Sequence, residues 1–346
     1  MVQKGERTLW IDSLKGVAIL CVVLGHVALG YRGIPMYPEY SWLMTAIGDA
    51  VYAFHMPLFF VLSGYMYCKA YVCDDETIDS QRLKRQALNL AVIYAVYSIV
   101  YGSFKILFGG YVNVEVTVTD LLMIWAKTID PYWYLYVLVM FYGAFFPKTV
   151  RNAAPGALFA VLLAVSIPIR SGLVSLTSWF QIDRFCNFAV FFYAGYLCAR
   201  RPSLFQGPRN PLIAVCTILS AAGICGFVLG RAPEYIPVFS TLFPLAFCLT
   251  LFWAFSRCKA LGENPLLCLC GRYSLEIYVL HNFLTAGLRP VFILLHIDNV
   301  AAGIFLNLVI STALPLLFAY SCRLLGIHAL FFKPGTFFER KLKKHA

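Results

Sequence analysis

Residues 10–31 read WIDSLKGVAILCVVLGHVALGY, an apolar run that is long enough to cross a lipid bilayer as one helix. About 20 predominantly apolar residues are needed for this, because each residue advances a helix by about 1.5 Å. Three ionisable side chains interrupt the run: Asp12, Lys15 and His26. Such groups are costly inside a membrane, so each of them is a candidate for a functional role.

The rest of the chain has the same apolar character. Of its 346 residues, 60% are hydrophobic and 13% are charged, against roughly 45–50% and 25% in ordinary soluble domains. Further apolar runs predict helices near residues 43–71, 87–109, 131–149, 155–170, 183–200, 211–230, 236–256, 266–287 and 300–325. We therefore expect an all-α polytopic membrane protein with about ten transmembrane helices in one domain over residues 1–346. The run 43–71 contains Pro57 and Gly64, so a kink or break is open there.

Basic residues predict the orientation in the membrane. With the N-terminus inside, seven of the 28 Lys and Arg residues fall on the outer side, Lys15 lies within the first helix and the other 20 fall inside. The seven are Arg32, Lys105, Lys127, Arg170, Arg184, Arg231 and Arg289. Cytoplasmic loops carry an excess of Lys and Arg, so we expect both termini in the cytoplasm and residues 326–346 to form a basic cytoplasmic tail.

The same bias explains the net charge of +11 without a nucleic-acid partner. We expect a multi-pass protein of the cell (inner or plasma) membrane, with the lipid bilayer as its surroundings. The 12 cysteines lie mostly in apolar runs, and none forms a Cys-x-x-Cys pair. We therefore interpret them as reduced packing residues and predict no metal site.

The spacing of Lys15 and His26 favours a specific chemistry. Eleven residues make close to three helical turns, so the two side chains share one face, about 16 Å apart along the helix axis. A cation near the cytoplasmic end suits the phosphates of a donor, and a deeper imidazole suits a general base at a thioester. The alternative is an ion pair between Asp12 and Lys15 at the membrane edge, with His26 hydrogen-bonded to a neighbouring helix.

Two motifs carry a resemblance to a known family. The run from Ile11 to His26 resembles the opening helix of the acyltransferase-3 family of membrane O-acyltransferases, whose signature is a basic residue and a His separated by ten residues. Residues 54–65, FHMPLFFVLSGY, resemble the second family motif, an aromatic run that ends in Ser-Gly-aromatic. The resemblance implies that Ser63 and Tyr65 line the active site. His55 precedes Pro57 and either lines the site or satisfies a kinked turn.

Three weaker matches follow in the family's order. They are Tyr132-Trp-Tyr-Leu135, Arg184 followed by FFYAGY at 191–196, and YSLEIYVLH at 273–281. By resemblance, Trp133, Glu276 and His281 line the site, although Glu276 and His281 also fit a packed polar pair. Arg184 stabilises an oxyanion or binds acceptor, and its alternative is an interfacial ion pair with Asp183.

One position departs from the family pattern. The family usually has Arg where this chain has Lys15, and the two differ because Arg grips phosphate with a planar fork whereas Lys offers a point charge. Lys-Gly at this position resembles the branch that includes sugar O-acetylases such as fucose 4-O-acetylase. Lys15 is therefore expected to keep its donor-binding role, with Asp12 beside it, and its exact partner is open.

The resemblance implies an acyl-CoA-dependent O-acetyltransferase. Acetyl-CoA would be the donor co-substrate, with no metal, and a cell-surface or lipid-linked glycan would be the acceptor at the outer face. His26 would remove the acceptor proton in a direct transfer. Two other classes are kept open: a secondary transporter, since intramembrane Asp, Lys and His also build proton relays, and a non-catalytic ligand-sensing membrane domain of the same fold.

Overall fold

The computed structural model describes residues 8–32, 41–73, 75, 77–108, 115–205, 210–228, 237–296 and 299–335. In these residues the secondary structure is helical, apart from one isolated bridge between Val72 and Ile78. Five helices are long and apolar enough to span a bilayer: α1 (Leu9–Arg32), α2 (Ser41–Tyr71), α3 (Ser80–Leu107), α10 (Phe239–Arg257) and α14 (Val300–Leu324). The predicted all-α polytopic membrane fold is confirmed.

Shorter helices fill the remaining predicted runs. Among them are α5 (Trp133–Ala144), α7 (Pro155–Arg170), α8 (Ile182–Arg200), α9 (Pro211–Val228), α12 (Pro265–Arg272) and α13 (Ser274–Leu294). The remaining elements have three to five residues each: α4 (Val118–Leu122), α6 (Lys148–Arg151), η3 (Trp179–Gln181), η4 (Pro202–Phe205), α11 (Lys259–Gly262) and α15 (His328–Phe332). Each of the ten predicted runs contains a helix.

Three predicted runs have wrong boundaries. The run predicted over 87–109 is α3, which begins earlier, at Ser80. The run 266–287 is not one helix, because α12 ends at Arg272 and a new helix, α13, begins at Ser274 and continues to Leu294. The run 131–149 ends early, at Ala144, and Pro147 then precedes the short α6. In contrast, α2 continues through Pro57 as one helix of 31 residues, so the proline does not divide it.

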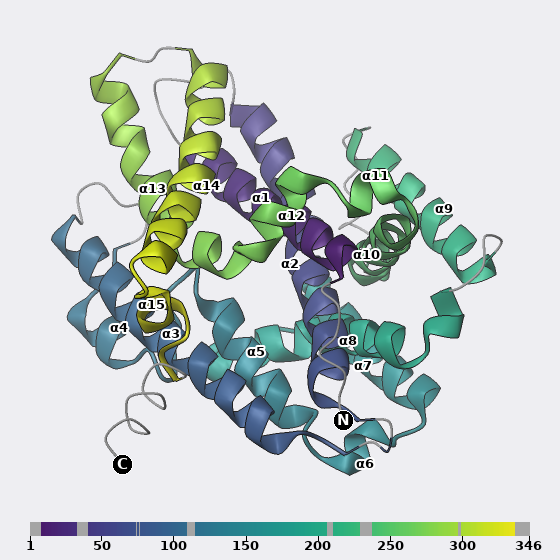
Figure 1. The fold of residues 1–346 in the computed structure, drawn as a ribbon. Coiled ribbons are helices and arrows are strands. Elements are labelled where there is room, and N and C mark those ends of the chain that lie inside the picture. The colour runs from purple at the N-terminus through teal and green to yellow at the C-terminus, as the bar shows by residue number, and fades with distance from the viewer. Residues whose placement is uncertain are drawn as a thin grey trace, which may run out of the picture. The chain divides into compact units, whose positions relative to one another are not determined.

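The chain forms two compact units. The first comprises residues 1–62, 203–232 and 242–316, and the second comprises residues 63–202, 233–241 and 317–346. In the first unit, α1 packs along α11, α12 and α13. Figure 1 shows α1, in purple, beside α12, in green.

Two glycines let α1 and α12 approach closely. A Cβ atom on Gly16 of α1 would lie 2.1 Å from the carbonyl oxygen of Leu267, and one on Gly271 of α12 would lie 1.7 Å from that of Asp12. Small residues at such crossings are typical of membrane helices, because close backbone packing is a main source of their association. The contact fixes the segment of α1 that carries Asp12 and Lys15.

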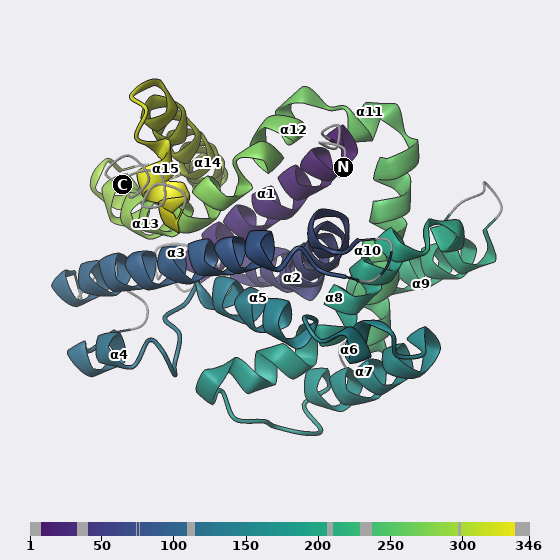
Figure 2. The same cartoon turned by 60° about the horizontal axis from the view of Figure 1, so that its bottom comes forward.

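The second unit is built on aromatic packing around α8. This helix packs against α5 and α7, while α3 packs against α5, α4 and α15 (Figure 2). Phe192 of α8 stacks on Phe141 of α5 at a centroid distance of 4.9 Å. Gly64 meets the Phe192 carbonyl, where a Cβ atom would be 1.8 Å away. The Ser-Gly-aromatic motif therefore has a packing role at Gly64.

Part of the predicted basic tail is folded. Phe332 of α15 is buried and stacks on Tyr97 of α3 at 6.4 Å, and the backbone N–H of Gly335 donates to Asn89 Oδ1 at 2.7 Å. Residues 336–346, which hold most of the tail's charge, lie outside the described residues. The segment that follows α14 is thus anchored to the second unit before the basic end begins.

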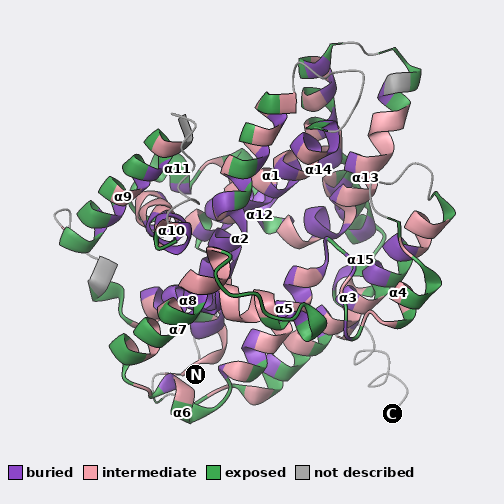
Figure 3. Cartoon of the chain, turned by 180° about the vertical axis from the view of Figure 1, so that it is seen from behind, coloured by how far each residue is buried: buried purple, intermediate pink, exposed green. Residues whose placement is uncertain are grey.

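Large apolar side chains remain exposed on the long helices. Figure 3 marks the exposed residues along these helices in green. On α3, Val96, Ile99 and Val100 are each about half exposed, and on α14 Phe305 and Leu317 are more so. Apolar patches of this kind are rare on monomeric soluble proteins, but they suit helices that face lipid tails. Burial therefore agrees with composition in placing these helices in a membrane.

Candidate functional site

The three ionisable residues of the opening run lie on one unbroken helix. Because α1 is continuous from Leu9 to Arg32, the predicted rise of about 16 Å from Lys15 to His26 holds in the structure. Asp12 is 6% exposed, whereas Lys15 and His26 are half-buried. The helix thus carries a cation near one end and an imidazole near the other, as expected.

Three imidazoles gather in the first unit. The rings of His26 on α1 and His281 on α13 have centroids 5.1 Å apart. Tyr52 of α2 lies 6.1 Å from His26 and 4.7 Å from His55, which is also on α2. We call His26, Tyr52, His55 and His281 the histidine cluster. His26 and His281, both of them predicted site residues, thus come together from two helices.

Backbone carbonyls orient two of the three imidazoles. His55 Nδ1 lies 2.7 Å from the carbonyl oxygen of Val51, and His281 Nδ1 lies 2.8 Å from that of Tyr278. A carbonyl only accepts hydrogen bonds, so Nδ1 carries the proton in both rings. In the neutral form this leaves Nε2 of each ring as an acceptor.

His281 Nε2 is buried and has no hydrogen-bond partner among the described residues. Its side chain is 0% exposed. Leaving a buried acceptor without a partner costs about 1–3 kcal/mol, and such groups in native structures often belong to sites of chemistry. His26 likewise makes no hydrogen bond within the described part of the chain. The cluster therefore presents imidazole nitrogens that a substrate can use.

The other candidate on α13 is Glu276. It lies in the first turn of the helix and is 5% exposed. Five residues separate it from His281, a rise of about 7.5 Å with a rotation of well over a quarter turn. The structure places Glu276 in the same unit as the histidine cluster but on a different face of α13 from His281.

The remaining candidates belong to the second unit. Ser63 Oγ and Tyr134 Oη are 2.6 Å apart and share a hydrogen bond. Tyr65, two residues further along α2, is half-buried. Ser63 is therefore tied to the residue that follows Trp133, so the second and third motifs meet in space.

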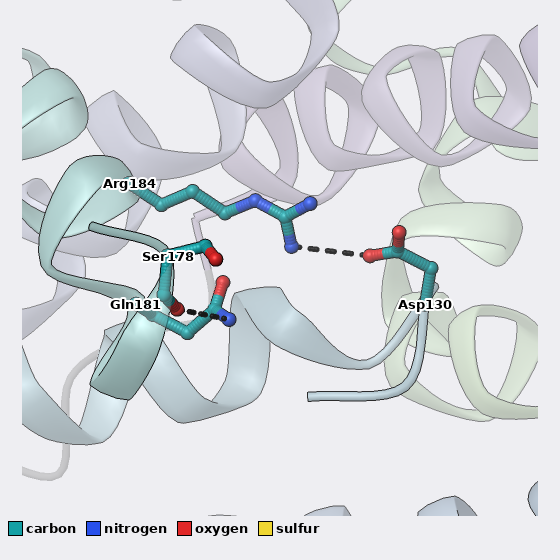
Figure 4. A network of polar contacts seen from close by, with 4 residues as sticks. All are labelled: Asp130, Ser178, Gln181 and Arg184. Carbon is teal, nitrogen blue, oxygen red and sulfur yellow. Dashed lines mark hydrogen bonds and ion pairs between the residues drawn. The ribbon is translucent and has the colours of Figure 1, made fainter. Parts of the chain in front are cut away.

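Arg184 is held by two partners. Its guanidinium carbon lies 4.5 Å from the ring centroid of Trp133, a cation–π contact, and its Nη1 donates to Asp130 Oδ1 at 3.1 Å. Figure 4 shows the side chain reaching from α8 to the loop that carries Asp130. The expected alternative was an ion pair with Asp183, but the ion pair formed is with Asp130. Its two side chains are 29% and 65% exposed, so solvent screens the interaction.

Backbone strain occurs just before Arg184. Phe180 and Gln181 have φ values of 55° and 56°, a left-handed conformation that is uncommon for residues other than glycine. The Phe180 N–H donates to the Ala126 carbonyl at 2.7 Å, and Gln181 Nε2 donates to the Ser178 carbonyl at 3.3 Å (Figure 4). Strain of this kind persists where the surroundings enforce it and is concentrated at functional sites.

Comparison with known proteins identifies the family of the chain. A family model described as "Acyltransferase domain" matches residues 8–323, which include α1 and most of each unit. The chain belongs to this acyltransferase family. The family resemblance seen in residues 11–26 and 54–65 is thus confirmed.

A curated relative shares a shorter stretch with this acyltransferase. The nodulation protein NolL of Sinorhizobium fredii (strain NBRC 101917 / NGR234) is 40% identical over 63 residues. These residues make up 18% of the chain and 16% of the length of NolL, so the likeness covers a small part of each protein. No solved structure matches the chain.

Two residues that contact the candidate site residues were not predicted from the sequence. Tyr52 links His26 to His55, and its signal is its position three residues before His55, which places the two on one face of a helix. Asp130 pairs with an arginine 54 residues away, and no local pattern reveals such a contact.

Within the described residues no group of three or more His, Cys, Asp or Glu side chains is placed to hold a metal ion.

Proposed function

We propose that this membrane acyltransferase is an O-acetyltransferase that moves acetyl from cytoplasmic acetyl-CoA to a hydroxyl of a cell-surface or lipid-linked glycan at the outer face. The observation that carries the proposal is the contact between His26, on the helix that also bears Lys15, and His281 of α13, whose ring centroids lie 5.1 Å apart. An acyltransferase needs a base for the acceptor hydroxyl, and imidazole is the side chain that exchanges protons most readily near neutral pH.

The proposed transfer is direct. A nitrogen of His26 takes the proton of the acceptor hydroxyl as its oxygen attacks the thioester carbonyl carbon. The tetrahedral intermediate then expels coenzyme A as the carbon–sulfur bond breaks, and the proton on His26 passes to the departing thiolate. Base and acid are the same residue at successive moments, so the protons balance.

His281 has a positioning role in this proposal. Its Nδ1–H is held by the Tyr278 carbonyl, so its buried Nε2 is left as an acceptor. An N–H of the neighbouring His26 is a suitable donor to it, and that bond would select the His26 tautomer with its other nitrogen ready to accept a proton. Removal of the His281 side chain should therefore slow acetyl transfer without lowering the affinity for the donor.

Lys15 and Arg184 have separate proposed tasks. Lys15, on the cytoplasmic side of His26 in the predicted orientation, binds donor phosphate, with Asp12 one turn away. Arg184 lies at the predicted outer end of α8, where Trp133 and Asp130 fix its guanidinium. We assign Arg184 to binding the acceptor, for which an arginine fork beside an aromatic ring is well suited. Ser63 and Tyr65 are proposed to line the acceptor side.

Purified protein in proteoliposomes tests the proposal. Radiolabelled acetyl-CoA is supplied on the cytoplasmic side, and acetyl transferred to acceptor or water is measured against label accumulated inside the vesicles. An acetyltransferase releases coenzyme A and labels an acceptor. Uptake without chemistry indicates a secondary transporter, and donor binding with neither indicates a ligand-sensing domain. Surface glycans from cells with and without the gene should differ by one acetyl unit in mass.

A further inference from the structure

Four rings contact one another in series within the histidine cluster. In order, they are the rings of His281, His26, Tyr52 and His55, at successive centroid distances of 5.1, 6.1 and 4.7 Å. These distances lie within the range of about 4.5–7 Å over which aromatic rings attract one another. All four residues belong to the first unit. His26, the proposed base, is thus in contact with two rings, one from α13 and one from α2.

Hydrogen bonds fix the two ends of this series but not its middle. His281 Nδ1 and His55 Nδ1 each donate to a backbone carbonyl of their own helix. His26 makes no hydrogen bond within the described part of the chain, so its orientation there depends on the rings that it contacts. The proposed function already gives His281 a part in orienting His26. Tyr52 is the second ring in contact with the base.

A glycine lets Tyr52 reach the backbone beside His26. A Cβ atom on Gly25 would lie 2.9 Å from Cε2 and 3.4 Å from Cδ2 of Tyr52, so the ring edge packs against α1 one residue before His26. The plane of the Tyr52 ring is inclined by 73° to that of His26 and by 87° to that of His55. Edge-to-face contacts of this kind are favoured by the ring quadrupoles, so they oppose rotation of either ring out of its place.

His55 supports the Tyr52 ring from α2. The His55 side chain is 2% exposed, and its Nδ1 lies 2.7 Å from the carbonyl oxygen of Val51. Tyr52 itself is 37% exposed. The contact of 4.7 Å therefore joins a partly exposed tyrosine to a buried imidazole that a backbone hydrogen bond holds in place.

From these contacts we infer that Tyr52 is a positioning residue, whose ring holds the His26 imidazole in the orientation that proton transfer from the acceptor requires. The inference rests on the proposed function, since it takes His26 as the base. Misplacement of a catalytic group by about 1 Å can cost on the order of a hundredfold in rate. Loss of the Tyr52 ring should therefore slow the chemical step and leave donor affinity unchanged.

The test compares Tyr52→Leu with Tyr52→Phe in the full-length protein. Turnover is measured at saturating radiolabelled acetyl-CoA, as label transferred to membrane glycans from cells without the gene, and donor affinity is measured by calorimetry. Tyr52→Leu should lower the turnover number about tenfold or more at unchanged donor affinity. Tyr52→Phe keeps the ring and should keep most of the wild-type turnover. A merely structural Tyr52 would instead lower the yield of folded protein and leave the turnover of the folded fraction intact.

Gly25→Ala provides a second, independent perturbation. Its new Cβ would meet the Tyr52 ring, so the variant should displace the ring and lower turnover. When it is combined with Tyr52→Leu it should add little, because the ring is already gone and changes at residues in contact are not additive. Gly48→Ala is the matched control. Its Cβ would lie 3.3 Å from Leu29 Cδ2, so it alters the approach of α2 to α1 at a side chain outside the ring series, and turnover should not change.

Full turnover in folded Tyr52→Leu would overturn the inference, and so would a loss in Tyr52→Phe as large as that in Tyr52→Leu. A folded Gly25→Ala protein with wild-type turnover would also overturn it, whether or not Tyr52→Leu folds. If His26→Ala is slow and Tyr52→Leu is not, the inference fails while the proposed function stands. A wild type that transfers no acetyl would overturn both.

Discussion

Substitution of Gly271 by alanine tests the packing that positions the donor end of the site. The new Cβ would lie 1.7 Å from the carbonyl oxygen of Asp12, and real Cβ contacts essentially never fall below 3.0 Å. The clashing atom belongs to the backbone, so rotation of a side chain cannot relieve the clash and α12 must move away from α1. Overpacking of this kind costs typically about 1–3 kcal/mol. In an unobstructed helix the same change would be favourable by up to about 1 kcal/mol, because alanine is the better helix former.

The assay is thermal unfolding of purified protein in detergent, followed by tryptophan fluorescence. Gly287→Ala is the matched control, since Gly287 lies on α13 in the same unit and its Cβ would meet nothing within 4 Å. We expect Gly271→Ala to unfold at a lower temperature than wild type, and Gly287→Ala at an equal or slightly higher one. Equal midpoints for the two variants would refute the close contact of α1 and α12.

Three further predictions concern the site and the orientation. Lys15→Ala should weaken acetyl-CoA binding, whereas Lys15→Arg should keep most of it because the positive charge survives; unchanged donor affinity in the alanine variant would leave Lys15 a structural partner of Asp12. His281→Ala should reduce the turnover number about tenfold or more at unchanged donor affinity, measured under saturating donor, and a variant with full turnover would remove His281 from the mechanism. A tag near Glu76 should be protected from external reagent in intact cells and a tag near Val114 should react, while the reverse would invert the topology.

The sequence predicted the helical fold well because hydropathy in a membrane protein is a strong signal. The bounds of α7 are those expected, 155–170. Those of α8 and α14 differ by one residue at one end, and those of α1 by one residue at each end. The break at Tyr273 was missed although Gly271, Arg272 and Ser274 surround it, because the predicted run 266–287 contains no proline. It reflects tertiary structure: α12 turns so that Gly271 can meet the backbone of α1.

The sequence predicted the spacing of site residues within one helix, but not the contacts between segments that are far apart in the chain. His26 and Lys15 share one helix, so their spacing follows from helical geometry alone, and the family resemblance pointed to His281, whose ring lies beside that of His26. The partner of Arg184 could not be predicted, because contacts across 54 residues depend on how loops fold back. The orienting carbonyls of Val51 and Tyr278 are backbone groups, which no side-chain pattern reveals.

The acetyl-transfer rate of His26→Ala, normalised to folded protein, tests the proposed role of His26 most directly. His26 makes no hydrogen bond within the described chain, so its removal strands no partner there and folding should survive. The variant should be a monodisperse protein that binds acetyl-CoA as the wild type does and transfers acetyl at least about a hundredfold more slowly. Near-normal turnover in well-folded His26→Ala would contradict the mechanism.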